Sequence, residues 1–221
     1  MSGNVKNVNG TDQWSFSSTN FESNYQKYFD PVDGMGFTTY SGWLNGMNGG
    51  NYESRTTGMI KTYPWGSPNH TRLFGEYARF VQSELEKTGL LEKSLFYWFD
   101  EPLPADYLYV KEGMDAIHNA APKLPRFLTE EPVSELFGSV DIWAPVHQNY
   151  NHEAAVARQK LGEKVWTYKC CCPRTGDLGI FIDRAAIEIR VWPWLIWRDC
   201  EYFPPPPFKK GTSQESRVRT I

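Results

Sequence analysis

Residues 94–102 read SLFYWFDEP, a short apolar and aromatic run that ends in two adjacent carboxylates and a proline. An apolar run of this length, bounded by polar residues, predicts a buried β-strand. Proline has no N–H to donate to a strand ladder, so Pro102 predicts where the strand ends. Burying Asp100 and Glu101 at that end is costly unless the carboxylates are paired, hydrogen-bonded or used in chemistry. The segment therefore indicates a strand that delivers an acidic pair to one edge of a sheet.

Strand and helix patterns alternate on both sides of this segment. Apolar residues recur at spacings of three and four, which predicts amphipathic helices over 72–88 and 104–120. The alternation predicts an α/β fold, a partial (β/α)8 TIM-type barrel whose parallel strands carry the chemistry at their carboxyl ends. Because the strands that we expect are too few to close an eight-stranded barrel, we expect a barrel that is not closed. The other expected elements are a weak strand at 37–40, strands at 126–129, 140–146 and 164–170, and helices at 152–161 and 184–198.

The chain divides into three expected segments. Residues 1–30 are rich in Asn, Ser and Gly without a visible period, which predicts an irregular segment that packs poorly against the rest. Residues 31–199 carry the barrel-like pattern of strands and helices. Residues 200–221 contain a run of prolines followed by a polar stretch, which favours polyproline II and then disorder.

Composition excludes several classes of function. The formal net charge is −3 and there is no basic stripe, so we expect no nucleic-acid partner. No apolar run approaches the roughly 20 residues of a membrane span, and the polar first residues do not resemble a secretory signal. The compartment and the oligomeric state stay open. The four histidines and four cysteines lack metal-ligand spacing, so we expect no metal or other cofactor.

Five motifs occur in a fixed order along the chain: FYWFDEP at 96–102, LTE at 128–130, VDIWAP at 140–145, VWTYKCC at 165–171, and FID at 181–183 followed by Arg190. None of these motifs is decisive alone, but as an ordered set over about residues 70–198 they resemble the catalytic domain of glycoside hydrolase family 123. The resemblance includes the many relatives of that family without an assigned function.

The resemblance implies a TIM-barrel glycoside hydrolase that is exo-acting and retaining. It implies a β-N-acetylhexosaminidase, similar to a β-N-acetylgalactosaminidase, whose substrate is a carbohydrate with a 2-acetamido sugar. Asp100 would orient the acetamido group, which itself attacks the anomeric carbon, and Glu101 would serve as general acid and then as general base. The competing interpretation is that both carboxylates only cap the following helix.

Aromatic residues make up 15% of the chain, and aromatic-rich clefts suit sugars, although we expect most of these rings to be core. Tyr150 could donate a hydrogen bond to the acetamide carbonyl group. Glu130 and Asp183 could bind sugar hydroxyl groups, or could instead pair with Arg126 and Arg190. The candidate substrate-binding residues are Trp98, Glu130, Trp143, Tyr150, Trp166, Tyr168 and Asp183.

The sequence also allows a function other than that of a glycosidase. Family members continue past the last helix into a further strand, and the residues after Asp199 contain nothing comparable. The N-terminal strands of the family are also not recognisable here. The alternative is therefore a non-catalytic, truncated fragment that acts at most as a carbohydrate-binding or interaction module.

Overall fold

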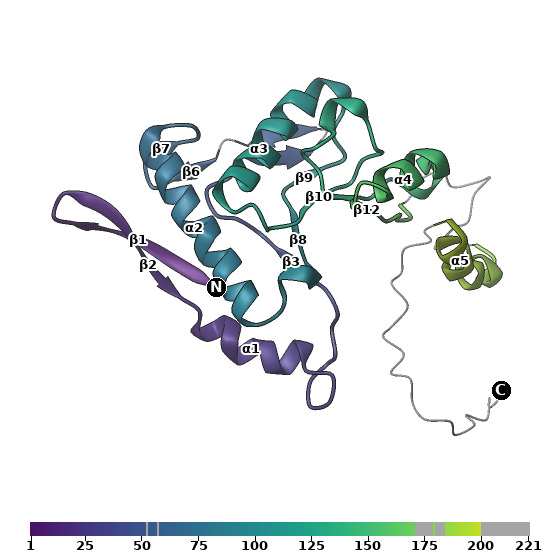
Figure 1. Cartoon of the computed structure of the whole chain (residues 1–221), viewed down its shortest axis with the longest axis horizontal. Helices are drawn as coiled ribbons and strands as arrows, with labels where there is room; N and C mark the ends of the chain where they lie inside the picture. Colours follow the sequence, from purple (N-terminus) through teal and green to yellow (C-terminus); the bar gives the residue numbers. More distant parts are fainter. Residues whose placement is uncertain (52, 57, 171–178, 180–183, 200–221) are drawn as a thin grey trace.

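The structure is a computed structural model that describes residues 1–51, 53–56, 58–170, 179 and 184–199 (Figure 1). Its centre is a five-stranded sheet in the order β12-β11-β10-β8-β3. All pairings in this sheet are parallel, so the carboxyl ends of its strands meet at one edge. The strands are β3 (Tyr40–Gly42), β8 (Ser94–Tyr97), β10 (Arg126–Leu128), β11 (Ile142–Trp143) and β12 (Lys164–Val165).

Helices connect the strands of this sheet as βα units. Helix α2 connects β3 to β8, α3 connects β8 to β10, and α4 connects β11 to β12. The start of α2 follows from local chemistry, because the Ser67 side chain accepts the N–H of His70 and Pro68 occupies the first turn. The described α-helices are α1 (Thr19–Phe29), α2 (Pro68–Lys87), α3 (Tyr107–Ala120), α4 (His152–Gln159) and α5 (Ala186–Asp199). Short 3-10 turns are η1 (Leu91–Lys93), η2 (Pro104–Asp106), η3 (Ser134–Leu136) and η4 (His147–Asn149).

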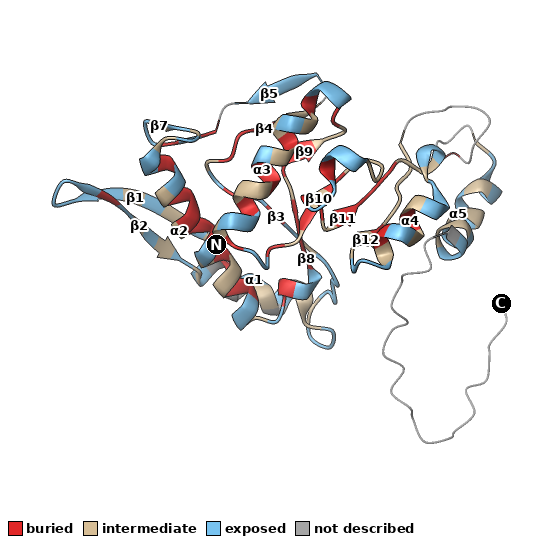
Figure 2. Ribbon diagram, turned by 45° about the horizontal axis from the view of Figure 1, so that its top comes forward, coloured by how far each residue is buried: buried red, intermediate tan, exposed pale blue. Residues whose placement is uncertain are grey.

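The hydrophobic core lies between the sheet and helices α2 and α3, where Figure 2 shows the buried faces of these elements. Gly113 of α3 has no side chain, so the indole ring of Trp98 packs directly against the helix backbone. The indole N–H of Trp98 lies 3.2 Å from the sulfur atom of Met114. The fully buried side chains of this core include Phe96, Phe99, Leu73, Leu85, Leu128 and Trp143.

Residues 1–30 are ordered, contrary to the expectation of an irregular segment. Strands β1 (Ser2–Val8) and β2 (Thr11–Ser17) form an antiparallel hairpin, and helix α1 follows. The hairpin packs on α2 (Figure 1), where the indole N–H of Trp14 donates to the carbonyl oxygen of Leu73 at 2.8 Å and Phe16 stacks on Phe80. Alternation along β2 is hard to recognise because only Trp14 and Phe16 are apolar and the preceding inward position is taken by a charged residue, Asp12. The Asn9-Gly10 pair at the turn, with both φ angles positive, is the signal that favours a hairpin.

The strand expected at 94–100 is divided at Trp98. Its first part is β8 of the main sheet, and its second part is β9 (Phe99–Asp100), which pairs with β4 (Gly49–Asn51) of a smaller sheet. Strand β5 (Ser54–Thr56) completes that sheet. A separate small hairpin joins β6 (Met59–Ile60) to β7 (Tyr63–Pro64). The division moves Asp100 out of the main ladder, although it stays beside the carboxyl end of β8.

The mixed α/β class and the parallel sheet agree with the sequence-based prediction. The sheet is open over the described residues, and these residues do not form a closed barrel. The expected tail at 200–221 lies outside the described residues. No helix in the described part of the chain is long and apolar enough to cross a bilayer.

Candidate active site

Asp100 and Glu101 follow β8 at the carboxyl edge of the sheet, and both side chains are half-buried. In an ideal strand, consecutive side chains point to opposite faces. Glu101 departs from this geometry with a φ of +43°, in the left-handed region that non-glycine residues seldom adopt. Such backbone strain occurs preferentially at functional sites. The change of backbone direction removes the alternation that would otherwise separate the two carboxylates.

Two hydroxyl groups hold the carboxylate of Asp100. The hydroxyl group of Tyr97, the last residue of β8, donates to Asp100 Oδ1. Thr129 Oγ1 lies 3.2 Å from the same oxygen, and Thr129 directly follows the neighbouring strand β10. Burial raises the pKa of the Tyr97 hydroxyl group, and the hydrogen bond to Asp100 adds to this effect. Tyr97 therefore stays protonated and remains a hydrogen-bond donor at neutral pH.

Glu101 is held through its backbone and its side chain. Its N–H donates to Thr129 Oγ1 at 2.9 Å, and its Oε1 accepts from the hydroxyl group of Tyr168. Tyr168 follows β12 and forms a parallel bridge with Val146, which follows β11. Burial raises the pKa of the Tyr168 hydroxyl group, and Glu101 raises it further. Residues from the ends of three parallel strands thus converge on the acidic pair, which is the arrangement that catalysis at a sheet edge requires.

Glu130 lies next to Thr129 at the same edge of the sheet. The Tyr107 hydroxyl group donates to Glu130 Oε1 at 3.1 Å. Burial, reinforced by the neighbouring Glu131, raises the pKa of the Glu130 carboxyl group to about 8. The alternative pairing with Arg126 does not occur, because the guanidinium group of Arg126 forms two 2.8 Å hydrogen bonds with the carboxylate of Asp141.

Aromatic side chains extend from the acidic pair toward β12. The ring of Phe127 lies 5.2 Å from Tyr97 and 5.7 Å from Trp166, measured between ring centroids. Tyr150 packs partly against the core, and its hydroxyl oxygen lies 3.4 Å from His152 Nδ1. The structure therefore connects Trp166 to the acidic pair through two other rings.

Trp98 and Trp143 lie in the core, contrary to the expectation that they contact a sugar. Trp98 is 4% exposed and faces α3, while Trp143 is fully buried and donates its indole N–H to Glu163 at 2.6 Å. The bend after β8 turns the ring of Trp98 toward Gly113. Neither indole ring faces solvent, so neither belongs to the sugar site proposed below. Asp183 lies outside the described residues.

The sequence-based reasoning missed Tyr97 and Thr129 as residues of the site. The register between β8 and β10 brings both residues to the same edge of the sheet. Phe127 of β10 pairs with Tyr97 of β8, and Thr129 lies two residues beyond Phe127. This signal can be used only once the alignment of β8 with β10 is known. Aligning the aromatic and acidic ends of the two strand patterns would have brought these residues together.

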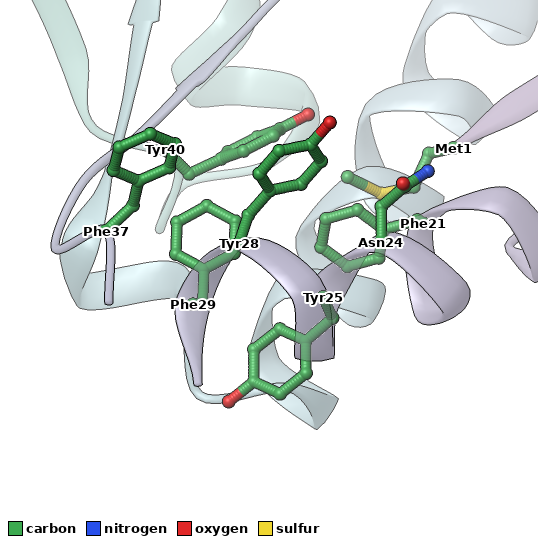
Figure 3. A pocket seen from close by; sticks show the side chains of 8 residues that line it. All are labelled: Met1, Phe21, Asn24, Tyr25, Tyr28, Phe29, Phe37 and Tyr40. Carbon is green, nitrogen blue, oxygen red and sulfur yellow. The ribbon is translucent and has the colours of Figure 1, made fainter. Parts of the chain in front are cut away.

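Other parts of the molecule offer less chemistry. Within the described ranges, no group of three or more His, Cys, Asp or Glu side chains is arranged to hold a metal ion. Cys170 is half-buried, and Cys171, Cys172 and Cys200 lie outside those ranges. A hollow of about 490 Å³ between α1 and β3 is lined mostly by aromatic rings (Figure 3). Its residue Tyr40 pairs with Ser94 at the amino end of the sheet, so the hollow is remote from the acidic pair.

In a comparison with sequence models of protein families, the glycoside hydrolase 123 catalytic domain matches residues 4–200. This range includes most of the N-terminal hairpin, all five strands of the main sheet and the acidic pair. No curated protein matches the chain. The match agrees with the resemblance that the ordered motifs indicate.

Proposed function

The chain belongs to the glycoside hydrolase 123 family, and from this premise we propose that it is a retaining, exo-acting β-N-acetylhexosaminidase. The preferred sugar is β-linked N-acetylgalactosamine, and the reaction is substrate-assisted. The observation that carries the proposal is the adjacent pair of Asp100 and Glu101, each held by a tyrosine hydroxyl group, one at the end of β8 and the other after β12. Paired carboxylates with separate partners are suited to separate roles in one reaction.

The first step breaks the glycosidic bond. Asp100 accepts the N–H of the substrate acetamido group and turns the acetamido carbonyl oxygen toward the anomeric carbon. That oxygen attacks the anomeric carbon while Glu101 gives its proton to the departing glycosidic oxygen. The products of the step are a cyclic oxazolinium intermediate, a free alcohol and an ionised Glu101.

The second step restores the sugar. The carboxylate of Glu101 takes a proton from water, and the resulting hydroxide equivalent attacks the anomeric carbon from the face that the alcohol left. The ring of the oxazolinium opens and the acetamido group is regenerated. Two inversions give net retention, and Tyr168 keeps Glu101 oriented through both steps.

Other residues at this edge of the sheet would bind the sugar. Burial raises the pKa of Glu130 to about 8, which favours its protonated form at neutral pH, and its carboxyl group can bind a sugar hydroxyl group. Trp166 offers a ring face, and Tyr150 offers a hydroxyl group for the acetamide carbonyl. Packing of a pyranose face on an aromatic ring combines apolar contact with a polar rim, which is typical of small-ligand sites.

The test compares two aryl glycosides that differ only in the acetamido group. We expect the purified chain to release nitrophenolate from nitrophenyl β-N-acetylgalactosaminide and not from nitrophenyl β-galactoside. Equal turnover of the two substrates would contradict substrate assistance. Binding of N-acetylgalactosamine without turnover of either substrate would favour the alternative, a non-catalytic carbohydrate-binding module. The open sheet of the described residues is compatible with that alternative.

The roles of the two acids are separated by the leaving group. Glu101→Gln should reduce kcat/KM for alkyl glycosides by about 10²–10⁴-fold and should affect kcat/KM for nitrophenyl glycosides far less, because nitrophenolate departs without a proton and kcat/KM covers only the steps up to its departure. Asp100→Asn should reduce turnover of both substrates, because it acts on the acetamido nucleophile. Equal losses on both leaving groups for Glu101→Gln would refute its role as general acid.

A further inference from the structure

The hydroxyl group of Thr129 contacts both members of the acidic pair. The N–H of Glu101 donates to Thr129 Oγ1 at 2.9 Å, and the same oxygen lies 3.2 Å from Asp100 Oδ1. The hydroxyl oxygen of Tyr97 also lies 3.2 Å from Thr129 Oγ1. One small side chain from the adjacent strand thus reaches the backbone of one acid and the carboxylate of the other.

The protons of this group can be assigned. A hydroxyl group has one proton to donate and two lone pairs to accept with. Thr129 accepts from the N–H of Glu101, so its own proton is available for Asp100 Oδ1, which also receives the proton of Tyr97. Among the described residues, no hydrogen bond reaches the second carboxylate oxygen of Asp100, which leaves Oδ2 to accept a donor from a ligand.

The backbone of Glu101 needs such a partner. Its φ of +43° is unfavourable for a residue with a side chain, and the surrounding structure must hold it there. The hydrogen bond from its N–H to Thr129 is comparable in strength with the cost of that conformation. The partner does not come from the main ladder, because β9 pairs with β4 and not with β10.

We propose that Thr129 is a positioning residue of the acidic pair. Its hydroxyl group holds Glu101 in the left-handed conformation and directs Asp100 Oδ2 toward the ligand, so that both consecutive carboxylates serve one site. The role in turnover rests on the proposed function, whereas the role in backbone conformation does not.

Three variants of the full chain test the role. Thr129→Val keeps the branched shape and removes the hydroxyl group, while Thr129→Ser keeps the hydroxyl group. Thr88→Val is the matched control, because Thr88 Oγ1 donates to the Glu84 carbonyl oxygen at 3.0 Å at the end of α2. The control removes a threonine hydroxyl group without altering the acidic pair.

The first measurement does not need activity. The Cα and Cβ chemical shifts of Glu101 in the labelled chain report whether its backbone is left-handed. We expect the left-handed pattern in the unmodified chain, in Thr129→Ser and in Thr88→Val, and its loss in Thr129→Val. Unchanged Glu101 shifts in Thr129→Val, or a Glu101 that is not left-handed in the unmodified chain, would overturn the proposal.

The second measurement is turnover of nitrophenyl β-N-acetylgalactosaminide. Misplacing a catalytic group by about 1 Å can cost on the order of 10²-fold, so we expect a loss of about that size in kcat for Thr129→Val with a smaller change in KM. Thr129→Ser should recover most of the loss. Full kcat in a Thr129→Val protein whose Glu101 has left the left-handed region would overturn the role in catalysis. No turnover by the unmodified chain, together with the expected shifts, would refute the proposed function and support the positioning role.

Discussion

Replacing Glu130 by Gln should change how the stability of the chain depends on pH. Burial and the neighbouring Glu131 raise the pKa of Glu130 from its ordinary value of 4.5 to about 8. A group whose pKa is higher in the folded state binds its proton more tightly there than in the unfolded chain. Its contribution to stability is therefore complete below pH 4.5 and is lost as the pH rises through about 8.

The size of the effect follows from the size of the pKa change. Each tenfold change in proton affinity corresponds to about 1.36 kcal/mol, which sets an upper limit of about 5 kcal/mol. Glu130 keeps partial contact with solvent, so screening reduces the expected loss to roughly 1–2 kcal/mol. Gln has nearly the same shape, does not ionise, and can still accept a hydrogen bond from Tyr107.

Urea unfolding followed by tryptophan fluorescence, at intervals between pH 5 and pH 9, measures this effect. The unmodified chain should lose roughly 1–2 kcal/mol relative to Glu130→Gln over that interval. Glu153→Gln is the matched control, because Glu153 is a solvent-exposed carboxylate on α4, and we expect it to follow the unmodified chain. If the free energy of unfolding falls equally with pH in the unmodified chain and in Glu130→Gln, then ionisation of the buried Glu130 carboxyl group does not destabilise the fold, and the reasoning is refuted.

Three further substitutions test other contacts. Asp141→Ala should destabilise the chain by about 3 kcal/mol, measured by urea unfolding, because it leaves the buried guanidinium group of Arg126 without its partner; a loss below about 1 kcal/mol would mean that solvent screens this pair. Gly113→Ala should destabilise by about 1–3 kcal/mol, seen as a lower melting temperature, because the new methyl group would collide with the indole ring of Trp98. Tyr168→Phe should reduce kcat by about tenfold through loss of one hydrogen bond to the carboxyl group of Glu101, with an unchanged melting temperature; unaltered kcat would remove Tyr168 from the mechanism.

Helices α2, α3, α4 and α5 could be predicted from the sequence because their signals are local, whereas α1 lies in the segment that we expected to be irregular. Helix α2 carries its own cap at Ser67 and a full apolar stripe; compared with the expected 72–88, it begins one turn earlier and ends one residue earlier. The strands are short, but β8 and β10 could also be predicted, because each is an apolar run that ends in polar residues. The hairpin at the N-terminus was missed because its aromatic face becomes recognisable only when α2 is present to cover it.

The position of Asp100 and Glu101 at the carboxyl end of β8 could be predicted because both residues directly follow an apolar run and precede a proline. The directions of Trp98 and Trp143 could not, because a strand has two faces and sequence alone does not say which face meets a helix. Trp98 lies where the strand leaves one sheet for another, so the alternation that starts in β8 does not continue past it. The fold decides the direction at that point through the space that Gly113 leaves in α3.

The hydroxyl groups around the acidic pair show why adjacency alone does not make a site. The side chains of neighbouring residues diverge in a strand, and Glu101 avoids this only through an unfavourable backbone conformation. The hydrogen bond that compensates for it comes from Thr129, a residue 28 positions away, and the second support of Glu101 comes from Tyr168, 67 positions away. Both residues reach the pair only because β8, β10 and β12 are parallel and end at one edge. The chemistry that the DEP motif can perform is therefore a property of the sheet, and a mutation that displaces β10 should impair the acidic pair even when both acids are intact.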